Sequence, residues 1–247
     1  MSGNNDELIW SSQWLRDAPA ELLQRLTALS RRRHLSDGEQ LYARGDTPEG
    51  LYGVIRGLIR VELIAIDGHE FLAGLYAPGD WLGEMSLFDE RPRAVHARAV
   101  GDTEILLLPA AQFRELLDAN PQWYRHFARV LSEKLRLAIS MIEDSLLLPL
   151  SQRLAKRLLD LAQVYSAQTA DGVLLKLHLP QEDLGRMLGA TRQSINKELR
   201  SLETRGILEL RHGRILIRNI EACRQTHAQR ARCSQPAARG APGCCCQ

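Results

Sequence analysis

Hydrophobic and polar positions change their spacing twice along the chain. Between about residues 38 and 108, apolar residues occupy every second position in short runs, as from Ile59 to Leu63, and glycines separate the runs. This alternation predicts strands, and frequent glycine turns indicate a compact antiparallel barrel or roll. Amphipathic helices are expected on either side, over residues 19–29 and 109–119.

A longer apolar stripe follows the strand region. From Phe127 to Leu148 the apolar positions recur at intervals of about 3.5 residues, over roughly three heptads. The stripe predicts a long helix that pairs in parallel with a second copy of the chain; a helix packed on its own barrel is the alternative. The residues expected in the dimer interface are Leu131, Ala138, Met141 and Ile142. Pro149 ends the stripe, and a second helix is expected over residues 150–165.

The segment from residue 179 to 219 predicts a winged helix-turn-helix. It has a helix from Gln181 to Leu188, a turn at Gly189-Ala190, a helix from Thr191 to about Thr204, and two strands joined at His212-Gly213. In such a motif the second helix enters the major groove, where Arg can bond guanine and Gln can bond adenine. A merely solvated polar face is the alternative. The expected DNA contacts are Thr191, Arg192, Gln193, Ser194, Lys197, Arg211 and Arg214.

Charge and composition support two different functions for the two halves. The formal net charge is +2, but residues 1–130 are acidic and residues 176–247 are basic, which suggests a polyanionic partner for the second half. The composition, 45% hydrophobic and 25% charged, is usual for a soluble globular protein. No apolar run is long enough for a membrane span and the start lacks a secretory signal, so a cytoplasmic protein without membrane contact is expected.

The stretch "GDWLGEMSLFDERPR", residues 79–93, contains the candidate chemistry. Two glycines lie close together, and a carboxylate at Glu84 and a cation at Arg93 flank a short apolar run. Glycine-rich backbone beside a guanidinium is typical of an anion site, and the carboxylate adds an acceptor for a hydroxyl group. The residues alone therefore predict a site for an anionic ligand that carries hydroxyls.

Three segments together resemble one family. They are "ARGDTPEGLYGVIRGLIRV", "GDWLGEMSLFDERPRAVHARA" and "LGRMLGATRQSINKELRSLE". From about residue 20 to 219 the chain resembles the Crp/Fnr family of transcription regulators. The resemblance implies an α+β fold with a cyclic-nucleotide-binding-type antiparallel β-roll, a long dimerisation helix and a C-terminal winged helix-turn-helix. The expected domains are the sensor, 1–126, the dimerisation helix, 127–148, the DNA-binding domain, 149–219, and a disordered tail, 220–247.

The resemblance also implies an effector site. Gly83 and the backbone N–H groups near Met85 would face a cyclic phosphate, and Arg93 would pair with it. Glu84 would accept a hydrogen bond from a ribose 2′-hydroxyl. Ala94 completes the implied site, at a position where cyclic-nucleotide binders usually have Ser or Thr.

Departures from the family pattern bear on the choice of effector. Besides Ala94, the pair Ala138-Ile139 stands where a relative has Thr-Ser, and losing three hydrogen bonds weakens binding roughly ten- to a thousandfold. Cyclic AMP or another cyclic nucleotide is the predicted effector; another small molecule, haem or a vestigial pocket are alternatives. All cysteines lie at or after Cys223, so no iron–sulfur cluster is expected. Haem would need a histidine ligand such as His34, His69, His96 or His126, and each is expected to be an ordinary surface or core histidine. No metal site is expected, since Cys223, His227 and Cys233 have poor metal spacing.

The predicted function is therefore effector-controlled binding to DNA. The resemblance implies a homodimer on a near-palindromic operator, with RNA polymerase as a further partner. No nucleophile–base pair or phosphate-transfer loop is evident, so the chain is expected not to be an enzyme. The alternative is a cyclic-nucleotide-binding module that controls a partner protein without binding DNA.

Overall fold

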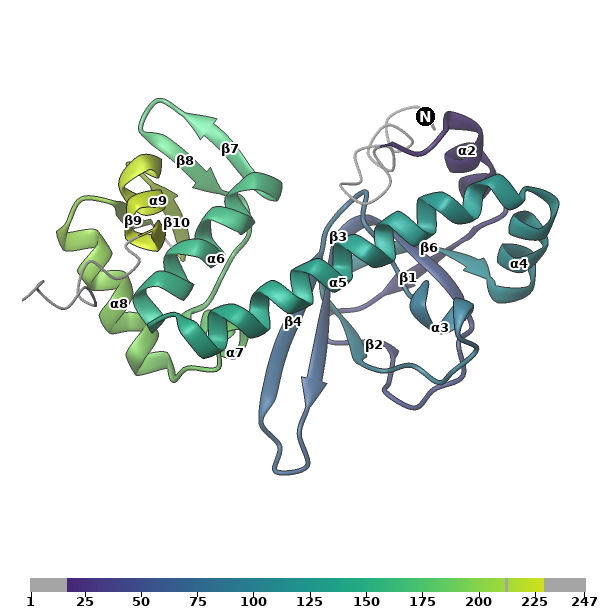
Figure 1. Ribbon diagram of the computed structural model, residues 1–247, viewed down its shortest axis with the longest axis horizontal. Coiled ribbons are helices and arrows are strands. Elements are labelled where there is room, and N and C mark those ends of the chain that lie inside the picture. Colours follow the sequence, from purple (N-terminus) through teal and green to yellow (C-terminus); the bar gives the residue numbers. More distant parts are fainter. Residues whose placement is uncertain (1–16, 212, 229–247) are drawn as a thin grey trace, which may run out of the picture. The chain divides into compact units, whose positions relative to one another are not determined.

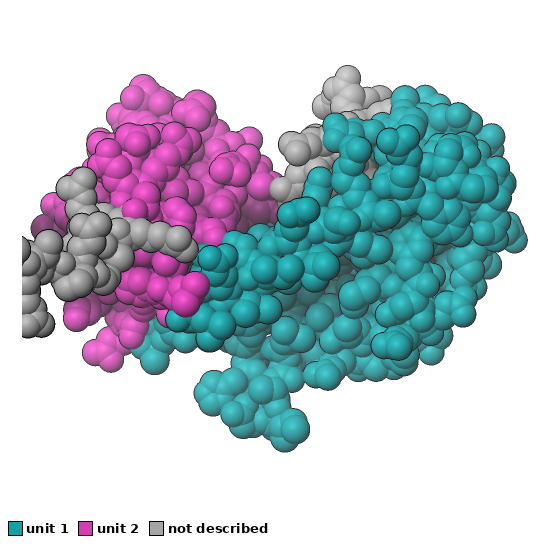
Figure 2. All heavy atoms as spheres, in the orientation of Figure 1, with its two compact units in different colours: residues 1–146, 182–191 teal, residues 147–181, 192–247 magenta. Residues whose placement is uncertain are grey.

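The chain divides into two compact units, shown in different colours in Figure 2. The computed structural model describes residues 17–211 and 213–228. The first unit comprises residues 1–146 and 182–191, and the second comprises residues 147–181 and 192–247. Among the described residues, no helix is both long enough and apolar enough to cross a membrane.

The first unit is built on an antiparallel sheet, as the alternating pattern predicted (Figure 1). Strands β1, β6, β3 and β4 are neighbours in that order, while β2 pairs with β6 and β5 pairs with β3. The strands are β1, Arg31–Leu35, β2, Gln40–Tyr42, β3, Gly50–Ile64, β4, Glu70–Tyr76, β5, Trp81–Leu82, and β6, His96–Pro109.

The two central strands are longer than the sequence suggested. Gly57 was expected to lie in a turn, but it lies inside β3, a single strand of 15 residues that pairs along its length with β6. The register shifts on both sides of Arg56, and Gly57 adopts a φ of +88°. A Cβ on Gly57 would lie 2.6 Å from the carbonyl oxygen of Asp102, so glycine permits a bulge where another residue would clash.

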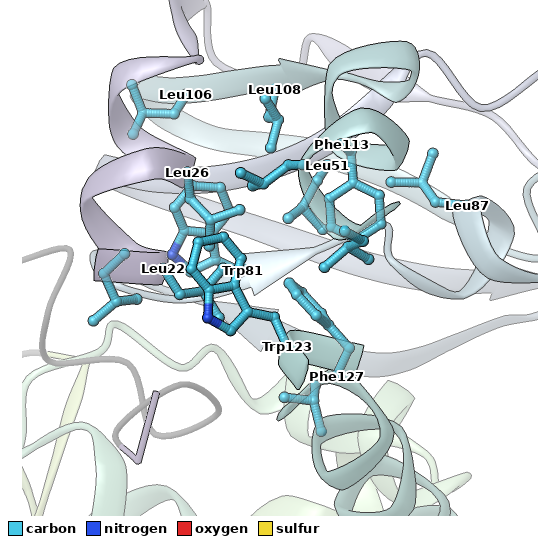
Figure 3. Close-up of a cluster of buried hydrophobic side chains, with 14 of the residues drawn as sticks. Leu22, Leu26, Leu51, Trp81, Leu87, Leu106, Leu108, Phe113, Trp123 and Phe127 are labelled. Atoms are coloured by element: carbon cyan, nitrogen blue, oxygen red, sulfur yellow. The ribbon is translucent and has the colours of Figure 1, made fainter. Parts of the chain in front are cut away.

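Helices cover one part of this roll and close its core. They are α2, Ala20–Ala28, α3, Met85–Phe88, α4, Ala110–Ala119, the 3₁₀ turn Pro121–Trp123, and α5, Tyr124–Leu147. Figure 3 shows Leu22 and Leu26 of α2 gathered with Trp81, Phe113 and Phe127. The rings of Phe113 and Phe127 meet edge to face with centroids 5.1 Å apart. This cluster anchors the start of the long helix α5 to the sheet. The bounds of α5 lie within three residues of the predicted ones, 127 and 148.

The second unit contains the second helix and the strands of the expected winged motif, together with an additional hairpin. Its four antiparallel strands are ordered β7-β8-β10-β9, and the β7–β8 hairpin was not predicted. Helix α7, Gln181–Leu188, has the predicted bounds and is grouped mostly with the first unit. The elements are α6, Leu150–Val164, β7, Ser166–Thr169, β8, Gly172–Leu175, α8, Arg192–Thr204, β9, Leu208–Arg211, β10, Arg214–Ile217, and α9, Ile220–Ala228.

Helix α9 corrects the prediction that residues 220–247 form a disordered tail. The helix packs against α6, and its Cys223 is fully buried, with Sγ 3.7 Å from the carbonyl oxygen of Ala155. Burial raises the pKa of the Cys223 thiol to about 11, so this cysteine stays protonated at neutral pH. The helix escaped prediction because few of its residues are apolar. Residues 229–247, including Cys233, lie outside the described part of the chain.

Candidate functional site

Residues 81–93, within the stretch "GDWLGEMSLFDERPR", form a turn that we call the cradle. Strand β5 pairs with β3, so Trp81 and Leu82 begin the cradle against the central strand. Gly83 then adopts a φ of +97°, and a Cβ at this position would lie 2.8 Å from Nη1 of Arg93. Only glycine allows the guanidinium to come this close to the backbone. The turn therefore brings the two ends of the cradle together.

Arg93 is buried within the cradle, with 3% of its surface exposed. Its Nη1 donates to the carbonyl oxygen of Gly83 and its Nη2 to that of Gly50, both at 2.6 Å. The guanidinium carbon lies 4.6 Å from the ring centroid of Tyr42 and 5.3 Å from that of Tyr52. Among the described residues, its buried Nε has no hydrogen-bond partner. Arg93 thus supports the cradle and retains one unused donor.

Glu84 is also buried and is paired with a residue that the sequence did not single out. Nζ of Lys134, on helix α5, donates to Oε1 of Glu84 at 2.7 Å and lies 3.4 Å from the carbonyl oxygen of Trp81. The same ammonium is 5.3 Å from the ring centroid of Tyr76. Burial alone lowers the pKa of Lys134, but Glu84 and Tyr76 outweigh burial and raise that pKa above its usual value. Lys134 is therefore charged when it holds Glu84.

The remaining predicted effector residues lie at the surface of the first unit. The side chains of Met85 and Ala94 are exposed, and Ala138 on α5 is exposed as well. The structure thus brings Gly83, Glu84 and Arg93 together and adds Lys134 to them. Lys134 escaped prediction because a lysine on the polar side of an amphipathic helix normally points into solvent.

Helix α7 ends as a helix-turn-helix motif requires. Gly189 has a φ of +58°, and the N–H group of Ala190 donates to the carbonyl oxygen of Gly185 at 2.9 Å. This is the hydrogen-bonding pattern of a glycine-terminated helix, and it stops α7 directly before α8 begins at Arg192.

Helix α8 has one buried side and one polar side. Its buried residues are Ile195, Leu199 and Leu202. Most of the predicted base-reading residues are exposed: Thr191, Arg192, Gln193 and Lys197, with Ser194 half-buried. Arg200 is exposed too and follows Lys197 by three positions, the spacing of one helix face, although it is not among the predicted DNA contacts. A continuous polar surface therefore begins at the start of α8.

The hairpin of β9 and β10 carries paired rather than isolated cations. Nε of Arg211 donates to Glu209 at 2.6 Å, and Nη2 of Arg211 lies 3.1 Å from Oδ2 of Asp171. Arg218 donates to the other oxygen of Glu209 at 2.6 Å, and these arginine bonds lower the pKa of Glu209. Arg214 is exposed. Of the two arginines predicted to contact DNA here, Arg211 is thus partly neutralised by acidic neighbours.

Two family models match two separate segments of the chain. The model described as the cyclic nucleotide-binding domain matches residues 32–120, and the Crp-like helix-turn-helix domain matches residues 152–226. The CRP-like cAMP-activated global transcriptional regulator of Mycobacterium tuberculosis is 30% identical over 184 residues, 74% of this chain and 82% of that protein. The chain belongs to the Crp/Fnr family.

Further relatives of this Crp/Fnr protein agree with that conclusion. The cAMP-activated global transcriptional regulator Vfr of Pseudomonas aeruginosa is 30% identical over 186 residues, 73% of this chain and 86% of that protein. The structure of FixK2 from Bradyrhizobium japonicum shares the fold, with a TM-score of 0.74 at 23% identity, over 82% of this chain and 99% of the other. The chain is a DNA-binding transcription regulator controlled by a small effector.

In this Crp/Fnr protein the β9–β10 hairpin is the wing of the DNA-binding motif, and Glu209 neutralises part of the charge of its arginines. Changing Glu209 to Gln removes the carboxylate that holds Arg211 and Arg218, so Arg218 becomes available to DNA phosphates while Arg211 keeps Asp171 as a partner. We expect tighter binding to non-specific duplex DNA and a salt dependence steeper by about one ion per subunit. Fluorescence anisotropy across a series of salt concentrations measures both quantities.

The control is Glu221→Gln, which removes the same charge from α9, where Glu221 lies 3.5 Å from Arg224. This variant should leave the salt dependence unchanged. If both variants tighten DNA binding equally, the effect comes from net charge alone, and the wing arginines are not DNA contacts.

Proposed function

We propose that the cradle binds a cyclic nucleotide and that binding controls the affinity of the chain for its operator. The observation that carries this proposal is the convergence of Gly83, Glu84 and Arg93 in one buried cluster within the domain that matches cyclic nucleotide-binding proteins. A cyclic nucleotide offers an anionic phosphate to Arg93 and a ribose hydroxyl to Glu84. The unused Nε–H of Arg93 is one donor that such a phosphate can take.

The proposed affinity is moderate, because Ala94 lacks the hydroxyl that relatives place beside the phosphate. Ala94→Ser should therefore tighten binding of cyclic AMP or cyclic GMP about two- to tenfold, the value of one hydrogen bond. Isothermal titration calorimetry gives both dissociation constants. The control Ala119→Ser adds a hydroxyl at the exposed end of α4 and should change neither. If no nucleotide binds to either protein, the effector is of another class.

We propose that α5 pairs with α5 of a second copy of the chain. Four apolar side chains, 55% to 76% exposed, follow one another at spacings of four, three and four residues, which is the pattern of a coiled-coil seam. They are Leu135, Ile139, Ile142 and Leu146. Of the predicted interface residues, Ile142 belongs to this seam, Ala138 is exposed beside it, and Leu131 and Met141 are half-buried. The proposed seam is thus shifted by a few positions along the helix.

Charged substitutions test whether the proposed seam forms the dimer contact. The double variant Leu135→Glu, Ile142→Glu places carboxylates in the proposed apolar contact and should convert the dimer to a monomer at micromolar concentration. Sedimentation velocity measures the change. Leu137→Glu is the control, since Leu137 is exposed but lies on the other side of the helix. A dimer that survives the double change and is disrupted by Leu137→Glu would place the interface on that other side.

We propose that α8 reads the major groove of a near-palindromic operator. Arg192 and Gln193 lie exposed at the start of the helix, where side chains reach base edges, and Arg200 lies further along it, where phosphate contacts are expected. In a dimer of this family the two recognition helices contact half-sites about 34 Å apart, or one helical turn of DNA. Lys197 lies between these two regions and can take either role. The wing cations Arg211 and Arg214 are proposed to contact the DNA backbone.

Removing Arg192 distinguishes base reading from phosphate binding. Arg192→Ala should cost about 1–3 kcal/mol on the best operator and relax the preference at one base pair per half-site. The matched variant Arg200→Ala should weaken all sequences alike. Selection from randomised duplex DNA with each protein measures both effects. Identical preferred sequences from wild type and Arg192→Ala would remove Arg192 from the base-reading residues, and failure of the wild type to retain any duplex would favour a module that acts without DNA.

Two further assignments complete the proposal. We propose RNA polymerase as a protein partner, because a regulator bound near a promoter acts on transcription through it. We also propose a cytoplasmic location and no catalytic activity, since the relatives that cover most of this chain are described as transcription regulators.

A further inference from the structure

The pair formed by Lys134 and Glu84 links two parts of the first unit that have different tasks. Glu84 belongs to the cradle, while Lys134 belongs to α5, the helix proposed to form the dimer. Phe127 and Val130 are the buried residues of α5, and both precede Lys134. Lys134 therefore links the cradle by an ion pair to the part of α5 that follows its buried residues.

The bond occupies the acceptor that an effector needs. The side chain of Glu84 is 6% exposed, and Lys134 already donates to its Oε1. A buried carboxylate must have a donor, so the ammonium satisfies Glu84 in the same way as a ligand hydroxyl does. Lys134 also bonds the carbonyl oxygen of Trp81, at the start of the cradle. A hydroxyl group that approaches Glu84 consequently has to compete with a charged donor from the chain itself.

We propose that Lys134 is an internal competitor for the effector: its ammonium occupies Glu84, and a hydroxyl-bearing anionic ligand displaces it. The inference rests on the proposed function, because it takes the cradle as the effector site. It assigns to Lys134 a positioning and specificity-determining role. The ligands that can displace it are those that bring a hydroxyl to Glu84 and an anion to Arg93 together.

Displacement of Lys134 also supplies a route from the cradle to the dimer. Lys134 directly precedes Leu135, the first residue of the proposed seam. While the ammonium is bonded to Glu84, this turn of α5 is tied to the cradle. When a ligand takes Glu84, the tie is lost and the turn is free to adjust its packing against a partner helix. Effector binding and dimer affinity are then coupled, and the coupling works equally in both directions.

The first test compares wild type with Lys134→Met, which keeps an unbranched side chain one atom shorter and removes the ammonium with its charge. Calorimetric titration with cyclic AMP should show at least tenfold tighter binding to the variant. With 2′-deoxy cyclic AMP, which lacks the hydroxyl, the gain should disappear. Arg125→Met is the control, since Arg125 is an exposed cation near the start of the same helix. Circular dichroism confirms that each variant is folded.

The outcomes separate the inference from the proposed function. Equal affinities for cyclic AMP in wild type and Lys134→Met overturn the competitor role and leave the effector site intact. Weaker binding by the variant also overturns it and makes Lys134 a direct ligand contact. Absence of binding by both proteins overturns the effector assignment together with the competitor.

A second measurement tests the route to the dimer. Sedimentation equilibrium gives the dimer dissociation constant with and without saturating cyclic AMP. The wild type should show a change of at least fivefold, and Lys134→Met should show little change, because its tie is already absent. If the variant retains the full change, the signal does not pass through Lys134.

Discussion

The buried guanidinium of Arg93 is the interaction on which the cradle depends. It bonds the carbonyl oxygens of Gly83 and Gly50, and thereby fixes the turn of the cradle to the beginning of the central strand β3. A guanidinium suits this position because its planar fork reaches two acceptors at once, while Tyr42 and Tyr52 cover it. The position of Glu84, and through it that of Lys134, follows from the same turn. Arg93 thus supplies the hydrogen-bond donor for an anionic ligand and also fixes the position of Glu84, the acceptor for a ligand hydroxyl.

The order and type of the elements were largely predictable from the sequence. The bounds of α7 and α8 follow from apolar spacing and from the glycine between them, and both are local signals. The length of β3 was not predictable, because Gly57 has the sequence signature of a turn and becomes a bulge only when β6 pairs beside it. Helix α9 was missed because its contact with α6 depends on small residues such as Cys223, which leave little periodic signal.

The candidate site was predictable only in part, for a related reason. Gly83, Glu84 and Arg93 are close in sequence, so their combination was visible as a motif. Lys134 is 50 residues away from Glu84, and nothing in its neighbourhood marks it as the partner of a buried carboxylate. Likewise, Arg211 was predicted to contact DNA, and one of the two carboxylates that hold it, Asp171, comes from the unpredicted β7–β8 hairpin. Pairings between distant segments determine which charges remain available, and a single sequence does not reveal them.

The central claim is that occupancy of the cradle and affinity for the operator are linked. Linkage requires that cyclic AMP change the operator dissociation constant by the same factor by which the operator changes the cyclic AMP dissociation constant. Both factors are measured on the wild-type protein at one salt concentration, by anisotropy of labelled operator and by calorimetry. The account predicts two equal factors, each of about fivefold or more. Cyclic AMP that binds in the cradle while the operator affinity stays the same would contradict it.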